Sequence, residues 1–253
     1  LVVTTATNLL TITATGTSTT GSNNSFVTGP LRKIGNAAFV FPVGKLIGAS
    51  NHYRTISISA PDNFADEFTA EFIRGNARLL GAGLITATGL QRVSQCEYWT
   101  LDHVNNGAAT SVNVSIGWTA QSPCNAGYVT ELPTVVIAHF NGTSWDSYGG
   151  GGAAMGAVSP GAGTITWNGV NAFSPFALGT TSVALNPLPL DLSGFSARAK
   201  NMEVVIDWHI MNNDEQEEYV IERSGDGVNF ELLRKIPAEV ILNHAVYTEV
   251  DLQ

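Results

Sequence analysis

The histidines and their neighbours are the first candidates for chemistry in this sequence. Five histidines are scattered along the chain, at positions 52, 103, 139, 209 and 244. Only His103 follows a carboxylate, in Asp102-His103, and adjacent residues of a strand point to opposite faces. A hydrolytic triad also needs a positioned serine, and no Gly-x-Ser-x-Gly elbow is present. These patterns predict that the chain is not an enzyme.

Four carboxylates gather around one expected strand: Asp62, Asp66, Glu67 and Glu71. Ca²⁺ is bound by oxygen ligands of this kind, so a calcium site is one interpretation. The ordered Asp-x-Asp-x-Asp-Gly spacing is absent, which favours a polar strand edge instead. Paired glycosidase acids leave no sequence signature, so an enzyme with two facing acids stays an alternative. We predict no cofactor, with calcium as the alternative.

Aromatic side chains could form a sugar-stacking patch. Trp145 and Tyr148 stand beside an Asn-Gly turn and a glycine-rich loop, which makes them the best exposed pair. Aromatic rings have an apolar face that suits amphipathic partners. The alternative is that these rings fill the core, as strand alternation places many aromatics inward. The pair is therefore a candidate ligand-stacking patch, but strand alternation favours packing of these rings in the core.

The two cysteines, Cys96 and Cys124, could form one disulfide. A bond across this spacing would stabilise the fold by roughly 3–4 kcal/mol on the chain-entropy model. An exported protein permits such a bond, and two unpaired buried thiols are the alternative. Neither cysteine has the neighbours of a zinc site, so we predict no metal ligands here.

Composition narrows the class of protein and its partners. Hydrophobic residues make up 44% of the chain and charged residues only 13%. Such a Thr- and Ser-rich composition suits extracellular β-proteins. With 12 basic and 21 acidic residues, the net charge of −9 argues against nucleic acid and anionic membranes as partners. No apolar run approaches the ~18–20 residues of a membrane span.

Period-two alternation dominates the chain and predicts an all-β fold. Clear examples are His52 to Ser59, Asp66 to Ile73 and Ser111 to Trp118. Val135 to Trp145 is expected to form a hairpin around Asn141-Gly142. Short strands separated by turns at this spacing indicate a β-sandwich, so we predict a jelly-roll-like sandwich.

Turn and proline signals divide the chain into four parts. Residues 1–29 are a Thr-rich β-strand lead-in, either the end of an upstream β-solenoid or strands of the sandwich that follows. Residues 30–184 form the sandwich domain. Residues 185–191 are a stiff Pro-containing linker. Residues 192–253 form strands in the order of a partial fibronectin type III-like or immunoglobulin-like module, with Trp208 as its core anchor.

Two groups of motifs resemble the C-terminal region of Bacteroidota proteins exported by type IX secretion. The first group begins with Phe26-Val-Thr-Gly-Pro-Leu-Arg-Lys33 and Phe39-Val-Phe-Pro-Val-Gly-Lys45 and runs to Gly179. The second is Leu188-Pro-Leu-Asp-Leu192, Trp208 and Glu222-Arg-Ser-Gly-Asp-Gly227. The stretch Trp208 to Glu215 departs from the usual family pattern. The sorting domain of such proteins is absent from this sequence.

The resemblance implies an extracellular, cell-surface location and a structural or adhesive role. The expected partners are neighbouring domains or copies of the protein, joined through strand edges, as in an extracellular filament. The alternative is a carbohydrate-binding accessory region of an enzyme that degrades polysaccharide. The second module holds fewer strands than a complete sandwich of its kind. Either the sequence is a slice of a longer protein, or a strand from another chain completes the sandwich.

Overall fold

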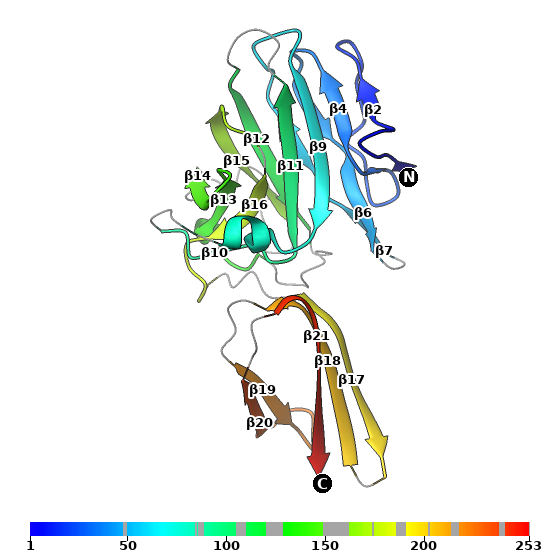
Figure 1. Ribbon diagram of the computed structural model, residues 1–253, viewed down its shortest axis with the longest axis vertical. Helices are drawn as coiled ribbons and strands as arrows, with labels where there is room; N and C mark the ends of the chain where they lie inside the picture. The colour runs from blue at the N-terminus through cyan, green and yellow to red at the C-terminus, as the bar shows by residue number, and fades with distance from the viewer. Residues whose placement is uncertain are drawn as a thin grey trace. The chain divides into compact units, whose positions relative to one another are not determined.

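The computed structural model of the chain is all-β and confirms the predicted sandwich class (Figure 1). It describes residues 1–47, 50–83, 85, 89–104, 110–119, 129–148, 162–173, 175–185, 191–201, 203–213, 218–237 and 241–252. The chain divides into two compact units, Leu1–Pro189 and Leu190–Gln253, here called unit 1 and unit 2. The division falls inside the expected linker, of which residues 186–190 lie outside the described residues.

Unit 1 contains three sheets. The largest follows the order β14 (Trp145–Tyr148), β13 (Val135–Phe140), β16 (Phe176–Thr180), β11 (Glu97–Val104), β9 (Glu67–Arg74), β4 (Leu31–Ile34) and β2 (Leu10–Ile12), with β10 (Arg92–Val93) also on β16. The second has the order β15 (Gly163–Val170), β12 (Val112–Trp118), β8 (Ile56–Ile58) and β5 (Phe39–Phe41). The third has the order β1 (Val2–Val3), β3 (Val27–Thr28), β6 (Val43–Ile47) and β7 (Ser50–Tyr53).

The main core of unit 1 lies between the largest sheet and the sheet formed by β15, β12, β8 and β5. Alternate residues of β9 (Phe68, Ala70 and Phe72) are fully buried, while their neighbours are half-buried. Strand β12 supplies Val114 and Ile116 from the other sheet to the same cluster. Because side chains alternate across a strand, one period-two pattern builds each inner face. This is the sandwich that the sequence predicts.

A second, smaller core covers the outer face of the largest sheet. The 3-10 helix η1 (Ala77–Gly83) and the strand β10 pack there, and Ala77, Val93 and Trp145 are fully buried. Strands β13 and β16 are therefore buried on both faces, and neither follows a simple in–out alternation. A further 3-10 turn, η2 (Leu132–Thr134), precedes β13.

The first strands of unit 1 stack in parallel. Val2 of β1 pairs with Val27 of β3, which in turn pairs with Val43 of β6. Leu10 of β2 pairs in the same way with Leu31 of β4. Two successive passes of the chain, residues 1–12 and 27–34, thus lie on one another like rungs of a β-solenoid. The strand β2 also belongs to the largest sheet of the sandwich, so both interpretations of residues 1–29 stay open.

The described residues of unit 2 form a small sandwich of five strands. One sheet has the order β17 (Asp191–Lys200), β18 (Glu203–Asn213) and β21 (Ile241–Leu252), seen side by side in Figure 1. The other contains only β19 (Glu218–Arg223) and β20 (Glu231–Pro237). Trp208, the expected core anchor, is buried and stacks on Tyr247 with ring centroids 5.2 Å apart. The strand β21 was not expected from the sequence.

Candidate functional site

The N-terminal strand edges of unit 1 are the first candidate surface, here called the N-terminal edge and defined by β1 and β2. Both strands stand last in their sheets, so each has one hydrogen-bonded neighbour among the described strands. No charged residue precedes Arg32 in the sequence. Val3 is 75% exposed and Leu1 is 56% exposed. Natural sheets protect open edges with charges, prolines or bulges, and this edge carries no charge.

Close backbone contacts hold the N-terminal rung on the next one. Gly29 has φ 109°, and a Cβ at this position would stand 2.3 Å from the Thr4 carbonyl oxygen. Thr4 is buried, and its hydroxyl donates to the Pro30 carbonyl at 2.7 Å. Glycine at position 29 therefore permits the two passes of the chain to meet.

Lys33 of β4 is the main polar anchor of the same rung. Its side chain is buried, and Nζ donates to the carbonyl oxygens of Thr13, Ala14 and Gly16 at 2.7, 3.1 and 3.0 Å. The ammonium also lies 5.5 Å from the centroid of the Phe39 ring. Three bonds to backbone carbonyls satisfy all three donors of a lysine, which makes its burial tolerable.

We expect Lys33→Met to release the turn at residues 13–16. The substitution keeps the length of the side chain but removes the ammonium that donates to three carbonyls, at a cost of about 2 kcal/mol. The Thr13 carbonyl still accepts from the Gly16 N–H, whereas the Ala14 and Gly16 carbonyls lose the donor described above. Amide hydrogen exchange should accelerate in residues 10–16 and remain unchanged in β12. The control is Lys45→Met on β6, which should cost less than about 1 kcal/mol. Equal effects of the two substitutions would refute the anchoring role of Lys33.

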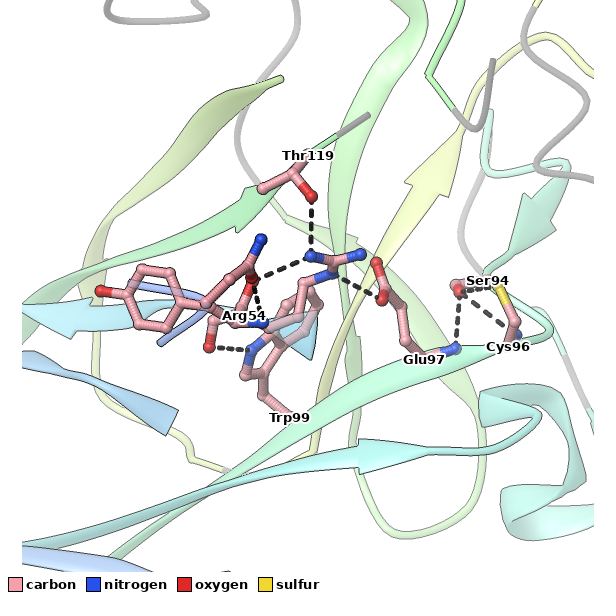
Figure 2. A network of polar contacts seen from close by, with 8 residues as sticks. Arg54, Ser94, Cys96, Glu97, Trp99 and Thr119 are labelled. Atoms are coloured by element: carbon pink, nitrogen blue, oxygen red, sulfur yellow. Dashed lines mark hydrogen bonds and ion pairs between the residues drawn. The ribbon is translucent and has the colours of Figure 1, made fainter. Parts of the chain in front are cut away.

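A fully buried ion pair is the strongest polar feature of unit 1. Arg54 Nε donates to Glu97 Oε2 at 3.0 Å, and neither side chain is exposed to solvent. Figure 2 shows the guanidinium between this carboxylate and Thr119, whose hydroxyl accepts from Nη1 at 2.8 Å. Nη1 also donates to the Tyr53 carbonyl. The backbone N–H of Glu97 donates to the Ser94 hydroxyl at 3.2 Å. This bond fixes the backbone from which the carboxylate side chain extends.

The ion pair and its hydrogen-bond partners join the ends of three strands. Arg54 follows β7, Glu97 begins β11 and Thr119 follows β12. Burial raises the pKa of Glu97, and the charge of Arg54 opposes this shift. Among the described residues that line the adjoining pocket, about 290 Å³ in volume, Arg54 is the one that carries a charge.

The structure places the two residues of Asp102-His103 in different surroundings. Asp102 is exposed, whereas His103 points inward, with Nε2 3.3 Å from Asp66 Oδ1. The His103 ring lies against Phe68 and Phe173, with centroids 4.5 and 5.0 Å away. These rings cover its faces and make it a core residue.

The four carboxylates of the alternative calcium site contact different partners. Asp62 accepts from the Ser111 N–H, Glu67 pairs with Arg32, and Asp66 lies beside His103. Glu71 is half-buried, and burial raises its pKa while Lys45 lowers it. Within the described residues, no three acidic, histidine or cysteine side chains converge as metal ligands would.

The expected stacking patch of Trp145 and Tyr148 does not form. Trp145 is fully buried, and its Nε1 donates to the Ala77 carbonyl at 3.2 Å. Tyr148 is 38% exposed and stacks on Trp167, with ring centroids 4.3 Å apart. Residues three apart in a strand point to opposite faces, so the two rings cannot share one surface. The core-packing interpretation therefore holds for Trp145, because the segment around η1 covers the face that carries it.

Cys96 is disulfide-bonded and buried. Its expected partner Cys124, the only other cysteine of the sequence, lies outside the described residues. The glycine-rich loop from Gly149 onward lies outside them as well.

An open apolar groove in unit 2 is the second candidate surface, here called the β17–β19 groove. It is lined by Phe195 of β17, Trp208 of β18, residues 219–222 of β19 and Phe230, and its volume is about 370 Å³. Phe195 is 66% exposed and Phe230 is 60% exposed. Exposed apolar surface gathered in a groove marks a place where another molecule or segment binds. Sequence patterns alone do not reveal the groove, because both phenylalanines occur where core residues are expected.

Comparison with protein-family models, curated proteins and solved structures finds no match to this chain. Among the described residues, no helix has the length and hydropathy needed to cross a bilayer. The two candidate surfaces, the N-terminal edge and the β17–β19 groove, are accordingly interpreted from their own geometry.

Proposed function

We propose that this chain is a non-catalytic structural and adhesive segment of a secreted cell-surface protein that assembles through β-strand edges. The observation that carries this proposal is the N-terminal edge. Two parallel ladders, β1–β3–β6 and β2–β4, end there in uncharged strands that have no second neighbour within the part of the chain that the structure describes. A further rung in the same register would continue both ladders at once.

Three features support a mechanical role over a catalytic one. The buried ion pair joins strands, the inward histidine is packed between phenylalanines, and the candidate sugar-stacking tryptophan is in the core. The motifs around Phe26–Lys33 and Glu222–Gly227 resemble those of type IX-secreted surface proteins, which supports an extracellular location. The work of the segment would be spacing and assembly at the cell surface, as in a filament subunit.

The proposal is tested by placing a charge on the N-terminal edge. The wild-type chain should associate as its concentration rises in sedimentation velocity, and Val3→Lys should remain monomeric over the same range. A lysine on an open edge opposes pairing with another strand. The matched control is Ser50→Lys, an exposed position on β7 at the other end of the same sheet. A monomeric wild-type chain, or equal behaviour of both variants, would contradict edge assembly.

A further inference from the structure

The β17–β19 groove runs along the edge of a strand rather than over one face of it. Four consecutive residues of β19, positions 219–222, line it, and such residues point alternately to both faces. In the described part of the chain, β19 is hydrogen-bonded only to β20, and β17 only to β18. The groove therefore combines an apolar floor, formed by Phe195 and Trp208, with an open strand edge.

The unit that contains the groove is acidic in composition. Residues 190–253 contain 13 acidic and 5 basic residues, whereas residues 1–189 contain 8 and 7. Unit 2 thus carries nearly all of the net charge of the chain. On β19 itself, Glu218 and Glu222 are exposed and alternate with the inward residues Tyr219 and Ile221. Glu218 is paired with Lys235, and no ion pair to Glu222 occurs among the described residues.

We propose that the β17–β19 groove accepts an extended β-strand from a partner polypeptide, in which large apolar residues alternate with lysine or arginine. The added strand pairs with the edge of β19 through its backbone. Its apolar side chains cover Phe195 and Phe230, and its basic side chains lie opposite Glu222 and Glu218. This inference rests on the proposed function, because it gives the chemistry of one partner for assembly through strand edges.

Charge is the reason to prefer a basic partner over a second copy of the chain. Antiparallel pairing of two β19 strands about Val220 would place Glu218 of one copy opposite Glu222 of the other. Like charges directly opposite one another destabilise a strand pair. The acidic excess of the whole of unit 2 adds repulsion between copies at low ionic strength. A partner strand with basic side chains avoids both the opposition of glutamates and the repulsion between two acidic units.

The test uses the intact 253-residue chain and a synthetic peptide of about ten residues that alternates tyrosine or valine with lysine or arginine. Calorimetry should show one peptide bound per chain, with an affinity that falls as salt is added. Amide exchange should slow in residues 218–223. A peptide of the same composition without the alternation, and one with glutamate in place of the basic residues, should each bind at least about tenfold more weakly.

Matched variants separate local from global charge effects. Glu222→Lys should weaken binding of the basic peptide about fivefold, which corresponds to the upper value for one exposed ion pair. Glu131→Lys makes the same change in net charge on an exposed residue of unit 1 and should leave binding unchanged. Phe195→Ser should weaken binding by removing the apolar floor.

Three outcomes overturn the proposal. They are absence of binding, equal binding of the alternating and non-alternating peptides, and self-association of the chain that buries residues 218–223. None of them bears on the N-terminal edge, whose test uses Val3→Lys in unit 1. A failed peptide experiment together with edge-dependent association would leave the proposed function standing.

Discussion

Replacing Arg54 by methionine is expected to destabilise unit 1 by about 3–5 kcal/mol. The substitution leaves the Glu97 carboxylate fully buried without its guanidinium partner. It also removes the donors to Thr119 and to the Tyr53 carbonyl. Because unit 2 has a core of its own, the unfolding of unit 1 should be followed by the exchange of amides in β9 and β11.

A double variant shows whether the stability that Arg54→Met loses comes from an unpaired buried charge. Arg54→Met combined with Glu97→Met replaces the pair by apolar side chains and should recover most of the lost stability. The single variant Glu97→Met should resemble Arg54→Met, because each leaves one partner buried alone. If the losses from the two single changes simply add in the double variant, the buried pair is not a coupled unit.

The pH dependence of Arg54→Met has a defined sign. Burial raises the pKa of Glu97, and Arg54 is the group that lowers it. Without Arg54, the folded state binds a proton more tightly than the unfolded state does. Its stability should therefore be highest below the unfolded pKa of about 4.3 and should fall as pH rises toward the folded pKa. A deficit that does not shrink in acid would contradict an unpaired Glu97 charge.

The second large effect is expected from Trp145→Ala, at about 3–5 kcal/mol. The indole fills the outer core beneath η1 and donates to the Ala77 carbonyl, so its removal leaves both a cavity and an unpaired acceptor. Urea unfolding of unit 1 measures the loss. Tyr148→Ala is the matched control and should cost only about 0.5–1.5 kcal/mol, mainly from its stacking on Trp167.

The opposite ranking of the two stability losses would favour an exposed ligand-stacking patch of Trp145 and Tyr148. If Tyr148→Ala costs as much as Trp145→Ala, or if Trp145→Ala costs less than about 1 kcal/mol, then Trp145 does not lie in the core. In the structure described here it is inaccessible to a sugar ring, so the carbohydrate-binding alternative loses one of its two candidate residues.

Local patterns were sufficient to predict the strands that make up the sandwich. The alternation of residues 66–73 appears as β9, and the hairpin around Asn141-Gly142 appears as β13 paired with β14. In both cases the signal is local, because side-chain period and turn residues depend only on near neighbours. The all-β class followed from many such segments.

The features that escaped prediction depend on residues far apart in the sequence. Arg54 and Glu97 are 43 positions apart, and Trp145 lies 68 positions from the carbonyl that holds it. The parallel stacking of residues 1–12 cannot be predicted for the same reason, because the side-chain pattern of a strand does not indicate which other strand pairs with it. The sequence shows that unit 2 is acidic, but it does not indicate the β17–β19 groove within that unit.

The claim that the N-terminal edge pairs in the assembled state is tested most directly by amide hydrogen exchange. Residues 2–3 and 10–12 would be compared between the isolated chain and protein recovered in assembled form from the cell surface. We predict rapid exchange of the outward-facing amides in the isolated chain and strong protection in the assembled material. Equally rapid exchange in both would show that the edge stays open and would contradict assembly through it.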